Sequence, residues 1–402
     1  MNNRKVYLDN NSTTPLHPEV QKEIIRACGI FGNASSMHSF GREARSEIET
    51  ARRITADFLG CRPDEILFTG SGSEANNAVI NNIICSKIPC TNKECPVGCG
   101  HKNHIITSAI EHPSVLQTCK CQEQRGFSVS YMPVDSDGII NPDDVKAAVK
   151  PQTALITVML ANNETGSLQP VKEIAALAKK NGILMHTDAV QAIGKLPVSV
   201  YDLGVDFLSL SGHKIYAPKG VGVLYIKNGI PFCPLIYGGH HEQSRRAGTE
   251  NNIGIIALGR AFSCLKNEMQ EETEKLQKLK KQLKTGLLEK IPEIEINGHD
   301  ELCLPGTLNV SFKYVEGESI LLYADMEGIA VSTGSACSSG SLDPSHVLLA
   351  MGRKPEEAHG SIRFSLGREN TEKDIDYVLE KFPAIIKRLR AMSPLYKTPC
   401  GK

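Results

Sequence analysis

The sequence has no excess of charge of either sign, no long hydrophobic run and no apolar stretch near its start. Lys and Arg together number 45, as do Asp and Glu, over 402 residues. This balance gives no electrostatic reason to expect nucleic acid or a membrane surface as a partner, so we expect a small-molecule ligand. No apolar run approaches the roughly 18 to 20 residues that span a bilayer, and residues 1–5 are polar, so we predict a cytoplasmic protein.

Cysteine is plentiful, at thirteen residues. In a large chain without a secretion signal, an odd number of cysteines favours reduced thiols over disulfides. Several lie in the segment 85–103, which interrupts the step from a helix to a strand. There Cys90, Cys95, Cys99 and His101 offer soft ligands for zinc or an iron–sulfur cluster. Their spacing is irregular, so reduced surface thiols and a sulfur relay stay open as alternatives.

Between residues 60 and 230, short apolar runs alternate with helical patterns. Continuous Val, Ile and Leu runs separated by helices predict an α/β fold with a mainly parallel sheet that is buried on both faces. The seven predicted strands are Glu65–Thr69, His104–Ser108, Ser128–Pro133, Ala154–Leu160, Ile183–Thr187, Phe207–Leu210 and Gly222–Ile226. The predicted helices between them are Ser73–Cys85, Pro113–Arg125, Pro142–Val149 and Val171–Asn181.

The pattern changes near residue 252. A long stretch rich in Glu, Lys and Leu, about residues 252–291, predicts a connecting helix. A second unit with two strands, two helices and a Ser/Gly-rich loop follows it. We therefore predict a large domain over 15–255 and a smaller α+β domain formed by 1–14 and 256–402.

One lysine is positioned for cofactor chemistry. Lys214 follows a predicted strand, so it would lie at the carboxyl end of the sheet, where α/β proteins bind ligands. Asp188 follows another buried strand, and a buried carboxylate there needs a cationic partner such as the protonated pyridine nitrogen of pyridoxal phosphate (PLP). Taken singly, Lys214 could be a surface charge and Asp188 a helix cap.

A phosphate group is suited to the Gly/Ser turn between a strand and a helix, where Gly72 and Ser73 offer backbone N–H groups and a hydroxyl. Ser211 and His213, beside Lys214, could add donors. His112 lies at a strand-to-helix turn, where its ring could cover a flat cofactor and move protons. A purely structural histidine is the alternative.

The combined pattern resembles the cysteine desulfurases, PLP enzymes of the class V aminotransferase group with fold type I. The resemblance covers nearly the whole chain. It rests on the stretches Tyr7–Pro15, Gly32–Gly41, Asn162–Gly166, Ser211–Lys214, Arg246–Thr249, Ser335–Cys337 and Ser361–Ser365. It implies conversion of L-cysteine to L-alanine, with the sulfur passing to a cysteine of the enzyme as a persulfide.

The resemblance also implies roles for single residues. Lys214 would hold PLP as a Schiff base, with His112 stacked on the ring, Asp188 at the pyridine nitrogen and Gln191 at the phenolic oxygen. Ser73, Ser211 and His213 would bind the phosphate, and Thr249 would reach the phosphate in the neighbouring subunit of a homodimer. Asn163 and Arg363 would bind the substrate, Arg363 through its carboxylate.

Cys337 narrows a general PLP enzyme to sulfur transfer. It lies in a small, polar loop from Val331 to Leu342, from which a thiolate could attack the substrate sulfur. Thr333 stands where the related motif often has serine. A long loop of this kind resembles family members that hand sulfur to a scaffold protein for iron–sulfur assembly. A selenocysteine lyase and a non-catalytic sulfur-transfer scaffold remain as alternatives.

Overall fold

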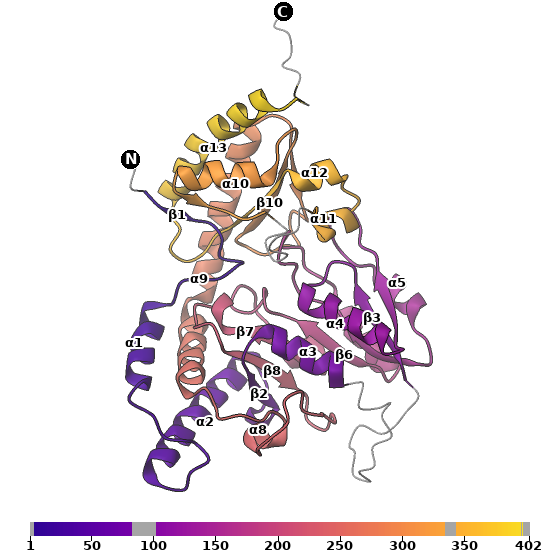
Figure 1. Cartoon of the computed structure of the whole chain (residues 1–402), viewed down its shortest axis with the longest axis vertical. Coiled ribbons are helices and arrows are strands. Elements are labelled where there is room, and N and C mark those ends of the chain that lie inside the picture. The colour runs from indigo at the N-terminus through magenta and orange to yellow at the C-terminus, as the bar shows by residue number, and fades with distance from the viewer. Residues whose placement is uncertain (1–3, 83–101, 334–342, 395, 397–402) are drawn as a thin grey trace, which may run out of the picture.

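The structure is a computed structural model that describes residues 4–82, 102–333, 343–394 and 396. Figure 1 shows a large lower unit and a smaller upper one, with the long helix α9 (Asn252–Lys290) running between them. The other helices of the large unit are α1 (Pro18–Ala27), α2 (Ser39–Leu59), α3 (Gly72–Asn82), α4 (Pro113–Gln124), α5 (Pro142–Ala148), α6 (Val171–Lys180), α7 (Val200–Leu203) and α8 (His241–Ser244). Two 3₁₀ turns lie at Pro63–Glu65 and Gly212–Lys214.

The large unit is built on a seven-stranded sheet with the strand order β2-β8-β7-β6-β5-β3-β4. β8 runs antiparallel to both of its neighbours, and the other adjacent pairs are parallel, which confirms the predicted mainly parallel sheet. The strands are β2 (Ile66–Thr69), β3 (His104–Ser108), β4 (Ser128–Met132), β5 (Thr153–Thr157), β6 (Leu184–Asp188), β7 (Phe207–Ser211) and β8 (Gly222–Ile226).

Helices cover both faces of this sheet. Side chains alternate between the faces of a strand, so Ile105 packs in one cluster with residues of α3 and α4. Its neighbour Ile106 packs in another cluster with residues of α2, α6 and the first half of α9. The continuous apolar runs of the sequence are explained by this burial on two sides.

The smaller unit contains the antiparallel sheet β12-β10-β9 and a parallel pair, β1 with β11. Helices α10 and α13 pack beside them in a second apolar cluster. Its strands are β1 (Val6–Tyr7), β9 (Ile294–Asn297), β10 (Thr307–Phe312), β11 (Ile329–Ala330) and β12 (Ser361–Ser365), and its helices are α10 (Gly317–Met326), α11 (His346–Ala350), α12 (Pro355–His359) and α13 (Glu372–Met392).

α9 contributes to both apolar clusters. Its residues Ile255–Leu265 face the large unit, and its leucines from Leu276 to Leu287 face the small one. The helix therefore fixes the two units relative to each other. The predicted domain boundary at residue 255 stays a prediction, because α9 runs across it without a break.

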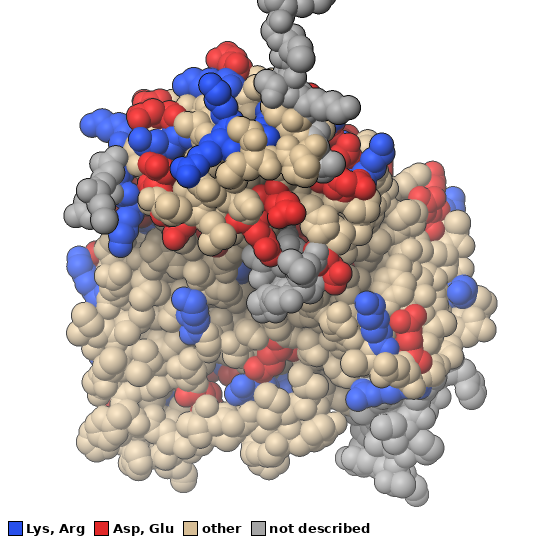
Figure 2. Space-filling view, turned by 45° about the horizontal axis from the view of Figure 1, so that its top comes forward, with Lys and Arg blue, Asp and Glu red and all other residues tan. Residues whose placement is uncertain are grey.

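The surface carries mixed charge. Figure 2 shows side chains of both signs intermingled at the end of the molecule that holds α10 and α13, with fewer charges on the lower part of the same face. Over the described ranges, no helix is both long and apolar enough to cross a membrane.

Candidate active site

The carboxyl ends of five strands converge on one cavity of about 270 Å³. Segments that follow β2, β3, β5, β6 and β7 reach it from the large unit, as the sheet rule for α/β ligand sites requires. The small unit supplies Arg363 from β12. Ten predicted site residues line the cavity: Gly72, Ser73, His112, Asn163, Asp188, Gln191, Ser211, His213, Lys214 and Arg363.

Lys214 follows β7 in the 3₁₀ turn Gly212–Lys214. Its Nζ donates to the backbone carbonyls of Asn11 (2.5 Å) and Ser12 (2.7 Å). Asn11 and Ser12 lie in the segment after β1, so the amino-terminal segment of the chain forms one wall of the cavity. The lysine is thus held in the site rather than in solvent.

Asp188 ends β6 and is buried, with 5% of its surface exposed. Its Oδ2 accepts from Asn76 Nδ2 (2.6 Å), and its Oδ1 accepts from the backbone N–H of Val190 (2.9 Å). Each carboxylate oxygen therefore accepts a hydrogen bond from the protein. A buried carboxylate held in this way is suited to a cationic ring nitrogen.

The start of α3 forms a narrow corner of the cavity. A Cβ atom on Gly72 would lie 2.7 Å from Val190 Cγ2 and 3.4 Å from Ser211 Cβ, so only glycine fits. Ser73 and Ser211 add hydroxyls at this corner. Burial and the nearby charge of Lys214 lower the pKa of His213 to about 4, so its ring is neutral. Backbone N–H groups at a helix start with neighbouring hydroxyls fit a phosphate group.

His112 begins α4 as its cap residue. Its Nδ1 accepts from the backbone N–H of Ser114 (3.1 Å), which assigns the ring proton to Nε2. Burial lowers the pKa of His112, Asp188 opposes this shift, and Lys214 and His346 add to it. The side chain therefore caps α4 and also lines the cavity, and its action on a cofactor stays a prediction.

Arg363 is almost fully buried, at 1% exposure. Its Nη1 donates to the carbonyl of Asn163 (3.0 Å), and its Nη2 donates to Asp9 Oδ1 (2.9 Å) and Ser12 Oγ (2.7 Å). Its Nε is buried without a hydrogen-bond partner among the described residues. A guanidinium that lines the cavity is suited to the carboxylate of an amino acid.

Several predicted residues lie elsewhere. Thr249 is exposed and outside the cavity lining of this chain. Cys337 and the metal candidates Cys90, Cys95, Cys99 and His101 lie outside the described residues, so their roles stay predictions.

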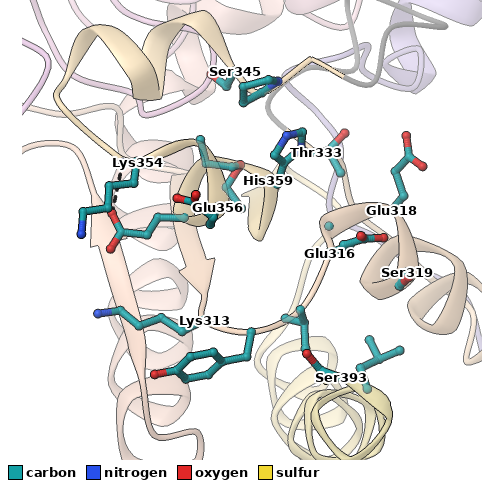
Figure 3. Close-up of a pocket in the computed structure, with 18 of the residues that line it drawn as sticks. Lys313, Glu316, Glu318, Ser319, Thr333, Ser345, Lys354, Glu356, His359 and Ser393 are labelled. Atoms are coloured by element: carbon teal, nitrogen blue, oxygen red, sulfur yellow. Dashed lines mark hydrogen bonds between the residues drawn. The ribbon is translucent and has the colours of Figure 1, made fainter. Parts of the chain in front are cut away.

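A larger cavity of about 1030 Å³ lies in the small unit. Figure 3 shows that Lys313 and Lys354 share it with Glu316, Glu318 and Glu356. The ten predicted cofactor and substrate residues named above line the smaller cavity instead, so the smaller cavity is the candidate active site.

One group of potential metal ligands lies within the described residues: His17, Cys264 and Glu268. His17 Nδ1 accepts from the backbone N–H of Glu19 (3.0 Å), so the proton lies on Nε2, which faces Glu268 Oε2 at 3.1 Å. A metal on Nε2 would require the proton on Nδ1 instead, against that N–H donor. The group is therefore an internal hydrogen-bonded pair beside a buried thiol.

Sequence reasoning missed several site residues. Asn76 orients Asp188, and Asn11 and Ser12 accept from Lys214. Asn76 could have been inferred from its position four residues after Gly72, because residues one helical turn apart lie on the same side of a helix.

The comparisons with known proteins agree with this geometry. Residues 6–378 match the family described as aminotransferase class-V. The chain is 47% identical to the cysteine desulfurase IscS of Clostridium botulinum (strain Hall) over 398 residues, 98% of each chain. A solved NifS-like protein is 38% identical with a TM-score of 0.88, over 96% of this chain and 100% of that one. A structure titled SspA in complex with cysteine is 34% identical with a TM-score of 0.79, over 91% of this chain and 100% of that one.

The family match spans most of the chain and both units of the fold. The identity to the clostridial relative extends over nearly the full length of both proteins. The chain therefore belongs to the class-V aminotransferase family and, within it, to the cysteine desulfurases.

Proposed function

We propose that this protein is a PLP-dependent cysteine desulfurase, which converts L-cysteine to L-alanine and transfers the sulfur to Cys337 as a persulfide. The observation that carries the proposal is the single cavity in which Lys214, Asp188, His112 and Arg363 meet. The close relatives named cysteine desulfurase, and the related structure titled as a complex with cysteine, support the choice of substrate.

The residues present fit PLP. The corner at Gly72, which a side chain would fill, suits the phosphate, and the buried carboxylate of Asp188 suits the pyridine nitrogen. Lys214 would hold the cofactor covalently, and Gln191 would donate to its phenolic oxygen. When bound, PLP supplies an electron sink for the substrate carbon beside the carboxylate.

The remaining groups act on the substrate. Arg363 would bind the carboxylate with its guanidinium, and Asn163 would position the amino acid beside it. His112 would cover the ring and hold a proton at Nε2. Cys337 would attack the substrate sulfur as a thiolate, so that an S–S bond forms and the C–S bond of the substrate breaks. The carbon would keep the electron pair and take up a proton to give alanine, and the sulfur would stay on Cys337 as a persulfide.

The active form is a homodimer in this proposal, and Thr249 of each subunit would reach the other subunit's phosphate. Thr249 is exposed, and Asn252, three residues later, donates to the carbonyl of Ile30. Phe31 beside it is 77% exposed, and its ring packs against that of Phe40. An exposed aromatic pair near Thr249 supports a protein interface at this place. Light scattering of the purified protein measures the oligomeric state directly.

The sulfur acceptor would be a scaffold protein of iron–sulfur cluster assembly or another sulfur-accepting protein, and the protein would act in the cytoplasm. Cys28, Cys61, Cys119, Cys121, Cys264 and Cys303 are thiols rather than disulfides, which suits a reducing compartment. Cys90, Cys95 and Cys99 would be reduced thiols, with zinc or an iron–sulfur cluster bound by them and His101 as the alternative that metal analysis of the purified protein tests.

The experiment that tests the function measures alanine from L-cysteine, and the sulfide that an added thiol reductant releases from the persulfide, with the purified holoenzyme and two variants. Lys214→Ala is expected to lose alanine production. Cys337→Ala is expected to lose activity on L-cysteine and to keep some on selenocysteine, because selenium release requires no thiol acceptor. Equal loss on both substrates would contradict the assigned role of Cys337. Alanine production by Lys214→Ala would contradict the whole proposal.

A further inference from the structure

A second lysine touches the cavity lining from outside. Lys195 lies between β6 and α7, and its Nζ donates to Asn11 Oδ1 (2.8 Å) and to Gln191 Oε1 (2.8 Å). Both acceptor residues line the cavity. Lys195 is therefore one contact away from the bound cofactor that we propose.

The ammonium group fixes the orientation of both amides. Ammonium has donors and no acceptor, so it binds the oxygen of an amide and repels its NH₂ group. Gln191 Nε2 then points the other way and donates to the backbone carbonyl of Asn11 (2.9 Å). Asn11 Nδ2 likewise donates to Thr307 Oγ1 (2.9 Å) and to the Asn163 carbonyl (3.2 Å).

This orientation matters because an amide nitrogen carries two hydrogens. One hydrogen of Gln191 Nε2 is used by Asn11, and the second remains for an acceptor in the cavity. With the amide reversed, the cavity would face a carbonyl oxygen, which repels an anionic oxygen of the cofactor.

We propose that Lys195 is a positioning residue, which holds the Gln191 amide so that an N–H faces the phenolic oxygen of PLP. The inference rests on the proposed function, because it assigns Gln191 to that oxygen. Lys195 itself would not contact the cofactor and would act on it only through Gln191.

The charges around Lys195 come from three other elements. Lys214 after β7 and Arg363 in β12 oppose its charge, and Glu272 in α9 favours it. Burial is the largest cause that lowers the pKa of Lys195 to about 7, and the two cations add to it. Burial and the two cations therefore disfavour the ammonium form, and Glu272 and the hydrogen bonds to the two amide oxygens favour it.

The test is a pH titration of the absorbance of bound PLP, which does not depend on turnover. A donor at the phenolic oxygen stabilises negative charge there and so favours loss of the cofactor's titrating proton. Lys195→Met is expected to raise the titration midpoint by about half a unit or more. Lys195→Arg keeps charged donors, so its titration midpoint is expected to lie close to that of the parent protein. Lys195→Gln replaces the Met variant if that variant does not fold.

The double variant with Gln191→Ala separates positioning from a direct effect of charge. If Lys195 acts through Gln191, adding Lys195→Met to Gln191→Ala changes the midpoint by no more than about 0.2 units. An unchanged midpoint in the single variant, or an equal shift in both backgrounds, would overturn the positioning role. Failure of the parent protein to bind PLP would instead refute the proposed function.

Discussion

Asn76 Nδ2 donates a hydrogen bond of 2.6 Å to Asp188 Oδ2, so the helix that begins at Gly72 also orients the buried carboxylate. The same nitrogen lies 2.9 Å from Ser114 Oγ. α3 therefore shapes two parts of the cavity: the glycine corner at its start and the carboxylate one turn later. Replacement of Asn76 should weaken cofactor binding while Lys214 and Cys337, the residues proposed to react, stay unchanged.

Asn76→Ala is expected to weaken PLP binding by roughly 10-fold or more, because a hydrogen bond to a charged group contributes about 1.5 to 3 kcal/mol. Fluorescence titration of the apoprotein with PLP measures the dissociation constant. Asn81→Ala is the matched control, since Asn81 lies on the same helix and donates to the Asn77 carbonyl instead. Equal dissociation constants for parent and Asn76→Ala would show that Asp188 does not need this donor.

Gly72→Ala is expected to reduce cofactor affinity strongly, because the added Cβ atom would lie 2.7 Å from Val190 Cγ2 and would displace the start of α3. Gly29→Ala is the control, since its Cβ atom would meet only the Arg26 carbonyl at 3.4 Å. The same PLP titration compares the two variants. A Gly72→Ala protein with parental affinity would argue against a phosphate at this corner.

Arg363→Lys is expected to raise the KM for L-cysteine by at least about 10-fold, because an ammonium cannot replace the fork of a guanidinium. Cysteamine, which is cysteine without its carboxylate, provides the comparison. The parent should prefer L-cysteine strongly, and the variant should lose most of that preference. An unchanged preference would mean that Arg363 does not bind the carboxylate.

Glu111 should make the protein less stable as the pH rises. Burial raises the pKa of its carboxyl from 4.5 to about 8, so between these values the folded state holds a proton that the unfolded state has lost. Stability then falls with rising pH, by on the order of 1 kcal/mol per unit at most.

Urea unfolding of the Glu111→Gln variant between about pH 5 and pH 8 tests this dependence. The variant should show a shallower decline than the parent across that range, and the remaining decline should come from Glu164, whose pKa burial raises to about 7. Glu289→Gln, at an exposed position, should keep the full decline of the parent. If the free energy of unfolding of the Glu111→Gln protein fell with pH as steeply as that of the parent, the pH dependence would belong to other groups.

The fold was largely predictable because the parallel strands have strong local patterns. Ile105 and Ile106 are both apolar since each faces a different layer of helices, and this double burial is what a continuous apolar run indicates. Strand ends were less predictable. β5 ends at Thr157, before the predicted Leu160, because the chain then turns to line the cavity at Met159.

Cavity residues that come directly after a strand in the sequence were predictable. Residues that contact the cavity lining only through the folded structure were not. Lys214 and Asp188 follow apolar runs, so their position at the sheet edge can be inferred from the sequence. Lys195 and Asn11 lie far apart in the chain and meet only in the folded protein, through a contact of 2.8 Å. No pattern in the sequence around either residue predicts this contact.

The central claim is that sulfur passes from L-cysteine to Cys337 with the help of Lys214. Its most direct test is to treat the holoenzyme with L-cysteine labelled at sulfur, digest it without reductant and map the label by mass spectrometry. We predict one labelled sulfur on the Cys337 peptide of the parent, and none there in Lys214→Ala. Label on Cys90, Cys95 or Cys99 with Cys337 unlabelled, or label on Cys337 without Lys214, would contradict the account.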